Sequence, residues 1–212
     1  MADMVFKYSA MNGGKTLNIL QTAYSYEENN FKIVIIKSKK DTKGKDTILS
    51  RNGMNRKVDI LLKEDESLLT PKNYKIYYNA KAILVDEVEL FEASQIKELW
   101  MIAHLINIPV IAYGLKSNFK GEIFSDAVSY MFSLSDHIEE IGSSSICLCG
   151  KKAVFNSRMV DDKFTDTGDT VVIDGSKKNV LYVPLCGDCF LKYVKINSDD
   201  AKKLTNLIAK IK

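Results

Sequence analysis

The stretch Tyr8-Ser9-Ala10-Met11-Asn12-Gly13-Gly14-Lys15-Thr16 decides the fold, because it joins an apolar strand-like run to a segment with helical spacing. A loop of small residues at such a junction can direct backbone N–H groups at phosphate oxygens, and the helix N-terminus adds positive charge. We therefore predict that residues 9–16 bind phosphate, with Lys15 reaching the outer phosphates and Thr16 binding Mg²⁺. The motif asks for glycine where Ser9 stands. A small-residue turn that only packs a helix on a strand is the alternative.

Length and composition indicate a globular chain of 212 residues that is 46% hydrophobic and 27% charged. The formal net charge of +3 is too small to argue for a nucleic acid or an anionic membrane as partner. No apolar run approaches the roughly 18 residues of a membrane span, and the N-terminus lacks the pattern of a signal peptide. We expect a cytoplasmic protein without a membrane or nucleic-acid partner.

The segments after the loop predict an α/β fold with a mostly parallel sheet flanked by helices. A helix over 16–28 is followed by an apolar strand over 32–37, which together with the first strand makes a βαβ unit. The polar segment 39–56 is interpreted as a solvated loop, or alternatively as a flap near the phosphates. Further along, we expect a helix over 64–75 that Pro71 interrupts or ends, and a last core strand over 130–134.

A second strong signal is the run Ala82-Ile-Leu-Val-Asp86-Glu87, in which large apolar residues lead into two carboxylates. Ligands bind at the carboxyl edge of the strands in doubly wound sheets. A buried strand that ends in Asp is what P-loop enzymes use to hold Mg²⁺. The alternative is an acidic strand end that caps the next helix, which we expect over 94–106 with Trp100 on its buried face. His104 and His137 show no pattern of a ligand or a catalytic group.

Four cysteines form two close pairs near the end of the chain, Cys147-Leu-Cys149 and Cys186-Gly-Asp-Cys189. In a reducing compartment this pattern favours metal binding over disulfides. We predict one structural Zn²⁺ held by all four thiolates, with buried free thiols as the alternative. The predicted division is a nucleotide-binding domain over 1–142 and a small zinc-binding domain over 143–212. The second domain would contain short strands around a polar loop, and a final helix over 199–211.

These motifs together resemble the zinc-containing thymidine kinase family of the cellular, tetrameric type, and in particular its bacterial branch. The resemblance covers about residues 5–190 in consistent order. It rests on these matches: 9–16, Asp41-Thr42, Ser50-Arg51, Asp86-Glu87, Tyr-Gly-Leu at 113–115, Phe119-Lys-Gly-Glu122 and Tyr182-Val-Pro-Leu-Cys186. It implies a P-loop (RecA-like) sheet with a C-terminal lasso, a homotetramer, and ATP-dependent phosphorylation of thymidine and deoxyuridine at the 5′-hydroxyl.

The resemblance also implies roles for individual residues. Glu87 would be the general base. Lys15 and Thr16 would hold the phosphates and Mg²⁺, with Asp86 and Asp41 completing the shell of the metal. The nucleoside would contact Met11, Leu115, Phe119, Val172, Ile173 and Tyr182, several of them in the lasso. Arg51 and Arg158 match basic positions of the family.

Some residues depart from the family pattern. Glu89 and Leu90 stand where the family has Gln and Phe, and Lys43 stands where it has Arg. Glu89 adds a carboxylate beside the expected base, which can raise a pKa or disturb a hydrogen bond. These departures leave two alternatives open: a degenerate relative that binds nucleosides with little turnover, and a zinc-stabilised ATPase acting on nucleic acid.

Overall fold

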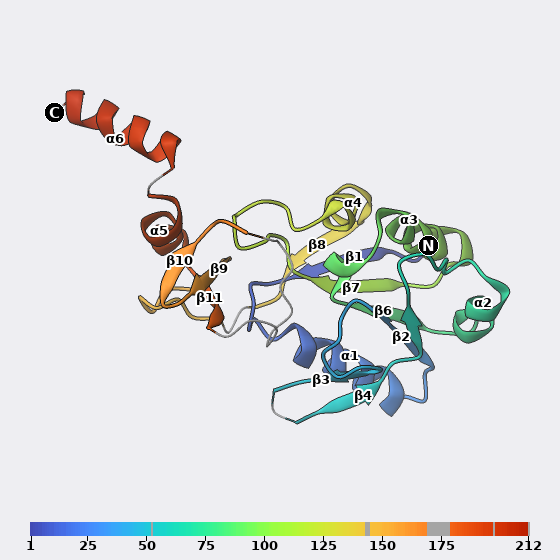
Figure 1. Cartoon of the computed structure of the whole chain (residues 1–212). Coiled ribbons are helices and arrows are strands. Elements are labelled where there is room, and N and C mark those ends of the chain that lie inside the picture. The colour runs from blue at the N-terminus through green and yellow to red at the C-terminus, as the bar shows by residue number, and fades with distance from the viewer. Residues whose placement is uncertain (52, 143–144, 169–178, 197, 212) are drawn as a thin grey trace. The chain divides into compact units, whose positions relative to one another are not determined.

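The computed structural model describes residues 1–51, 53–142, 145–168, 179–196 and 198–211 (Figure 1). The chain forms two compact units, which we call unit 1 and unit 2. Unit 1 consists of residues 1–9, 13–116 and 123–142. Unit 2 consists of residues 10–12, 117–122 and the described residues from 145 onward. Among the described residues, no helix is both long and apolar enough to cross a membrane.

Unit 1 is built on a six-stranded sheet in which every neighbouring pair is parallel. Its strand order is β5 (Ile60–Leu62), β2 (Ile33–Ser38), β6 (Ala82–Asp86), β7 (Val110–Gly114), β1 (Met4–Tyr8) and β8 (His137–Glu140). The central strands are apolar because helices cover both of their faces. The predicted α/β fold with a parallel sheet is confirmed, and all strands present their carboxyl ends at one edge.

Helices lie on both faces of this sheet (Figure 1). Each face has its own cluster of buried apolar residues. Helix α1 (Lys15–Glu28) packs on one face together with the hairpin of β3 (Thr47–Leu49) and β4 (Asn55–Lys57). The other face is covered by α2 (Pro71–Tyr77), α3 (Ala93–Met101) with its continuation Ile102–Ile106, and α4 (Asp126–Leu134). The segment 39–56, expected to be a loop, therefore contains a hairpin, whose Ile48 is buried against α1.

Unit 2 contains a three-stranded antiparallel sheet, in the order β10 (Lys163–Thr165), β9 (Phe155–Val160) and β11 (Val180–Leu185). The short helix α5 (Gly187–Phe190) follows, then the turn Leu191–Lys195 and the final helix α6 (Asp199–Ile211). Its small core joins three of the cysteines to Leu185 and Phe190, and the Phe190 ring stacks on Phe155 at 4.8 Å. The expected final helix is confirmed.

The predictions for two segments were wrong. The segment 130–134 belongs to helix α4, because Ser125 caps its start by accepting a bond from Val128 N at 3.4 Å. The buried residues of α4 recur at helical spacing. The last strand of the unit 1 sheet is instead β8, whose residues are exposed. Pro71 begins α2 instead of ending a helix, since proline suits the first helical turn.

Trp100 was also expected to be buried on α3. Its side chain is 38% exposed and its ring lies 4.9 Å from that of His104.

Candidate functional site

The carboxyl edge of the unit 1 sheet carries the end of β6 and, within the same unit, Ser9 and residues 13–16 of the glycine-lysine loop, whereas residues 10–12 belong to unit 2. The loop before α1 follows β1, and Asp86 and Glu87 follow β6. Strand β7 lies between them and ends at Gly114. Ser9 continues the pairing beyond β1, because its N–H donates to Gly114 O at 3.4 Å. Gly114 has no room for a side chain, because an added Cβ would lie 2.6 Å from both Val88 Cγ1 and Glu89 Oε2.

The start of α1 has the geometry of an anion site. Gly14 adopts a left-handed conformation, with φ of 85°, immediately before the helix. Among the residues that the structure describes, no side chain caps the start of this helix, and its first turn contains no acidic residue. The first N–H groups of a helix have no partner within the helix, so they and the helix dipole favour a bound anion. Lys15, the first helical residue, has a buried side chain that is 8% exposed.

Asp86 is a buried carboxylate with an unfilled bonding position. Its side chain is 4% exposed, and among the described residues no donor lies within hydrogen-bond distance of its Oδ1. Burial and the negative charge of Glu87 raise the pKa of Asp86 to about 7, although Lys15 counteracts them. An orphaned carboxylate oxygen in such a place suits a hydrated Mg²⁺, which binds through few protein oxygens and keeps its waters.

Glu87 follows in a left-handed conformation, with φ of 48° and ψ of 53°. A non-glycine residue there costs about 1–3 kcal/mol, and such strain gathers at functional sites. Burial opposes the ionisation of Glu87, but Lys15 and a hydrogen bond from the Glu89 side chain lower its pKa. The result is an ionised, half-buried carboxylate next to a buried ammonium group.

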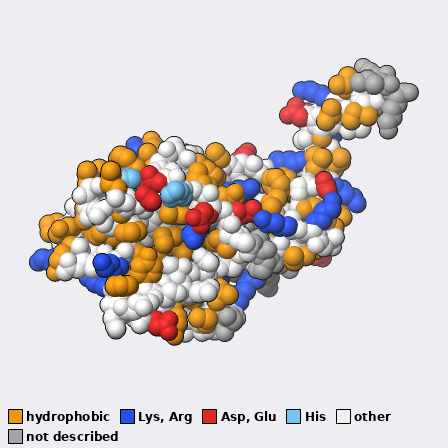
Figure 2. Space-filling model, turned by 180° about the vertical axis from the view of Figure 1, so that it is seen from behind, with side chains coloured by type: hydrophobic (Ala, Val, Ile, Leu, Met, Phe, Trp, Pro, Cys, Tyr) orange, Lys and Arg blue, Asp and Glu red, His pale blue; other side chains and the backbone are white. Residues whose placement is uncertain are grey.

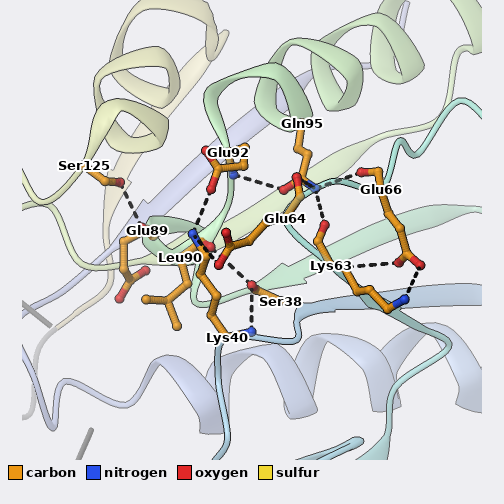
Figure 3. Close-up of polar contacts among 10 residues, drawn as sticks. All are labelled: Ser38, Lys40, Lys63, Glu64, Glu66, Glu89, Leu90, Glu92, Gln95 and Ser125. Atoms are coloured by element: carbon orange, nitrogen blue, oxygen red, sulfur yellow. Dashed lines mark hydrogen bonds and ion pairs between the residues drawn. The ribbon is translucent and has the colours of Figure 1, made fainter. Parts of the chain in front are cut away.

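The turn after Glu87 is fastened at several points (Figure 3). Ser125 Oγ donates to Glu89 O at 2.9 Å, and Ser38 Oγ donates to Leu90 O at 3.2 Å. Glu92 then caps α3 in a reciprocal pair with Gln95. The alternative interpretation was that the acidic strand end, Asp86-Glu87, caps the next helix. The cap of α3 is Glu92 instead, so Asp86 and Glu87 are available for chemistry.

Lys37 was missed as a site residue. It lies one residue before the end of the apolar strand β2 and is paired with Asp86 in the sheet register, and its side chain is 1% exposed. Its Nζ lies 3.0 Å from Asp41 Oδ2 and donates to the carbonyl oxygens of Lys43 and Thr47. The only sequence signal was a lysine inside a run of buried residues, four positions before an aspartate.

Asp41 is therefore already engaged. Its Oδ1 accepts from Lys43 N at 2.9 Å, and its Oδ2 pairs with Lys37. Two carboxylates are predicted to associate with the metal. Both oxygens of Asp41 have a partner, whereas among the described residues Oδ1 of Asp86 has none. The role of Asp41 at the metal stays a prediction.

The four cysteines of unit 2 form one cluster, as predicted. All four sulfur atoms lie within 4.8 Å of one another, and Cys149 Sγ is 3.6 Å from Cys186 Sγ. Zn–S bonds of about 2.3 Å in a tetrahedron place sulfur atoms about 3.8 Å apart. These distances and the soft thiolate donors fit Zn²⁺, so Cys147, Cys149, Cys186 and Cys189 could hold that ion.

The backbone around the cysteines supports the charge of thiolates. Gly150, in a left-handed conformation, closes the first turn by donating from its N–H to Cys147 O at 2.8 Å. Burial opposes ionisation of Cys147, but backbone N–H donors from Cys149 and Cys186 lower its pKa to about 6. The two turns are also linked at their surface, where Lys151 Nζ lies 2.7 Å from Asp188 Oδ2.

Asn156 is a second residue that sequence reasoning missed. Its Oδ1 accepts from Met11 N at 2.8 Å, and its Nδ2 donates to Ser117 O at 2.9 Å. Ser145 Oγ donates to Met11 O at 2.6 Å. Asn156 is buried, so one amide side chain on β9 fixes two loops within unit 2. A lone Asn in a strand gave no signal of this role.

Phe119 is buried in its loop, with 2% of its surface accessible. The guanidinium carbon of Arg158 lies 3.8 Å from the centre of its ring, a cation–π contact. Arg158 also donates to Thr167 O, and it pairs with Tyr182 in the register of β9 and β11. Arg158 is thereby placed next to two predicted nucleoside contacts.

The predicted nucleoside contacts are distributed over the chain. Met11, Phe119 and Tyr182 belong to unit 2, whereas Leu115 is buried in unit 1. Val172 and Ile173 lie outside the described residues. This set of contacts stays a prediction.

The two histidines of the chain lie on the unit 1 surface beside acidic side chains (Figure 2). His104 Nε2 is 3.3 Å from Asp136 Oδ2, and His137 Nε2 is 3.3 Å from Asp3 Oδ2.

Comparison with known proteins gives one consistent family. The model of the thymidine kinase family matches residues 2–190. Curated thymidine kinases resemble the chain: that of Francisella tularensis subsp. tularensis is 35% identical over 190 residues, which are 88% of this chain and 95% of the relative. The Listeria monocytogenes serotype 4b protein is 36% identical, covering 89% and 96%. The Enterococcus faecalis protein is 34% identical, covering 94% and 100%. With the glycine-lysine loop, the strand-end carboxylates and the four-cysteine cluster in place, this chain belongs to the thymidine kinase family.

Proposed function

We propose that this protein transfers the γ-phosphoryl group of ATP to the 5′-hydroxyl of thymidine, forming dTMP and ADP. The observation that carries the proposal is the end of β6, where Asp86 and Glu87 lie at the same sheet edge as Lys15 and the start of α1. Phosphoryl transfer depends mainly on positioning and on neutralising charge, and this edge offers groups for both tasks.

The phosphates are the ligand that the start of α1 fits. The free N–H groups at Gly14, Lys15 and Thr16 and the helix dipole attract the phosphate oxygens. The Lys15 ammonium group, already desolvated, neutralises charge that develops on the outer phosphates. This arrangement holds the transferred group close to the strand-end carboxylates.

Mg²⁺ would be held by the hydroxyl of Thr16 and by Asp86, whose orphaned Oδ1 suits a metal-bound water. The ion supplies charge neutralisation on the phosphate oxygens when it is bound. Because a metal competes with a proton for the carboxylate, the raised pKa of Asp86 makes Mg²⁺ binding stronger as the pH rises through 7.

Glu87 accepts the proton of the 5′-hydroxyl as that oxygen attacks the γ-phosphorus. The new bond forms between the nucleoside oxygen and phosphorus, and the bond from phosphorus to the bridging oxygen of ADP breaks. A base must be unprotonated to act, and the lowered pKa of Glu87 keeps it so at neutral pH.

Thymidine recognition is assigned to Met11, Leu115, Phe119, Val172, Ile173 and Tyr182. Within unit 2, Asn156 holds the two loops that carry Met11 and Phe119, through its bonds to Met11 N and Ser117 O. We expect deoxyuridine as a second substrate, because it differs from thymidine by one methyl group and such a difference is worth only about 1–3 kcal/mol. A cytoplasmic homotetramer, with the domains divided at residue 142, completes the proposal.

The test is an assay of nucleoside monophosphate and ADP formation with thymidine, deoxyuridine and deoxycytidine. Thymidine should be converted with one ADP per dTMP. Replacing the base in Glu87→Gln should lower kcat by about 10²–10⁴-fold, with little change in the KM for ATP. Glu28→Gln, on the exposed end of α1, is the control and should match the wild type.

Two outcomes would contradict the proposal. Binding of thymidine without turnover would indicate a nucleoside-binding relative, and ATP hydrolysis that depends on added DNA would indicate an ATPase acting on nucleic acid.

A further inference from the structure

The middle of the phosphate-binding loop, residues 10–12, belongs to unit 2. Within this unit Met11 is held on both sides of its backbone. Its N–H donates to Asn156 Oδ1 at 2.8 Å, and its carbonyl oxygen accepts from Ser145 Oγ at 2.6 Å. The next residue, Asn12, is left-handed, with φ of 63°. A residue other than glycine keeps such a conformation only where its surroundings hold it, and the two bonds hold the residue before it.

The segment that carries Phe119, residues 117–122, is a closed turn that also belongs to unit 2. Asn118 closes it, because its N–H donates to Glu122 O at 2.9 Å. The first residue of the turn is bonded to the same side chain that holds Met11, since Asn156 Nδ2 donates to Ser117 O at 2.9 Å. One side chain of β9 therefore connects the phosphate-binding loop to the Phe119 turn.

The amide of Asn156 matches these two partners in only one orientation. Its oxygen can only accept and its nitrogen can only donate, and the Met11 N–H and the Ser117 carbonyl oxygen are the complementary groups. The side chain is 4% exposed, so water has little access to replace a lost bond. A buried backbone group that loses its partner is costly, so each segment should shift when its half of the amide is removed.

We propose that Asn156 is a positioning residue for both substrates, whose amide oxygen holds the phosphate-binding loop for ATP and whose amide nitrogen holds the Phe119 turn for the nucleoside. This inference rests on the proposed function, which assigns residues 9–16 to the phosphates and Phe119 to thymidine. Because each half of the amide serves one substrate, a substitution that changes one half should affect one substrate.

The test separates the two halves. Asn156→Asp keeps an oxygen that accepts from Met11 N, but its carboxylate has no donor for Ser117 O and repels that oxygen. At pH 8, where aspartate is ionised, the affinity for thymidine should fall about tenfold, the typical effect of one lost hydrogen bond. The affinity for ATP should stay at the wild-type value. Asn156→Ala removes both bonds and should weaken both ligands.

The two affinities can be measured without turnover, by calorimetry with thymidine alone and with a non-hydrolysable ATP analogue and Mg²⁺. Ser145→Ala removes the other bond to Met11 and should weaken the ATP analogue. Asn206→Asp, the same substitution at an exposed position of α6, is the control and should match the wild type. Urea unfolding shows whether each variant is folded. If Asn156→Asp does not fold, Asn156→Ala and Ser145→Ala decide the matter.

A loss of ATP affinity in Asn156→Asp as large as its loss of thymidine affinity would indicate a general structural role and overturn the inference. Wild-type affinities in Asn156→Ala would also overturn it. A wild-type protein that binds the ATP analogue but not thymidine would contradict the proposed function instead. The positioning of Met11 would then stand if Asn156→Ala weakens the analogue and Asn156→Asp does not, and it would fall otherwise.

Discussion

Gly114 should be intolerant of even one added carbon atom. A Cβ at this position would lie 2.6 Å from Val88 Cγ1 and 2.6 Å from Glu89 Oε2, well inside van der Waals contact. Val88 is fully buried and the Glu89 side chain is 4% exposed, so close packing leaves neither neighbour much room to move aside. Gly114→Ala should therefore displace the turn that carries Glu87.

The size of the effect follows from close packing. Overpacking by one carbon typically costs about 1–3 kcal/mol of the free energy of unfolding. A displacement of about 1 Å at a catalytic group can lower the rate about 10²-fold. We expect Gly114→Ala to be destabilised within that range, as measured by urea unfolding, and to lose about 10²-fold in kcat for thymidine phosphorylation.

Gly142→Ala is the matched control, because an added Cβ there has no neighbour within 4 Å. It should keep both the stability and the kcat of the wild type. A Gly114→Ala protein with wild-type stability and kcat would refute the reasoning that this turn positions the base.

Three further predictions concern the buried charges and the metal. Lys37→Met should lower the free energy of unfolding, measured by urea unfolding, by about 1–3 kcal/mol, because it leaves the buried partners of Lys37 unpaired. The control is Lys40→Met, which removes a more exposed ion pair and should cost less than about 1 kcal/mol. Burial raises the pKa of Asp86 from 3.8 to about 7, so the metal-free folded protein holds this proton more tightly than the unfolded chain. Its stability should fall as the pH rises through that interval, and Asp86→Asn should flatten the decline. Cys147→Ser should lower the zinc content, measured by metal analysis, from about one ion per chain in the wild type; unchanged zinc content would contradict the four-cysteine site.

The sequence by itself determined the elements whose signals are local. The run at 82–87 predicted a buried strand ending in two carboxylates, because a parallel sheet is covered on both faces. The glycine-lysine loop predicted a strand-to-helix junction, since glycine there permits the left-handed conformation seen at Gly14. The cysteine spacing likewise predicted one cluster, because sulfur ligands around a single ion need a tight turn on each side.

Only the tertiary structure decided what depends on contacts between distant segments. The Tyr130–Leu134 segment has the composition of a strand, but Ser125 capping and the packing of Met131 against the sheet make it helical. Burial of Lys37 and Asn156 cannot be recognised from their neighbours in sequence. Burial and the charge of Glu87 raise the pKa of Glu89, and a pKa responds to charges and burial in space, which chain order alone does not specify.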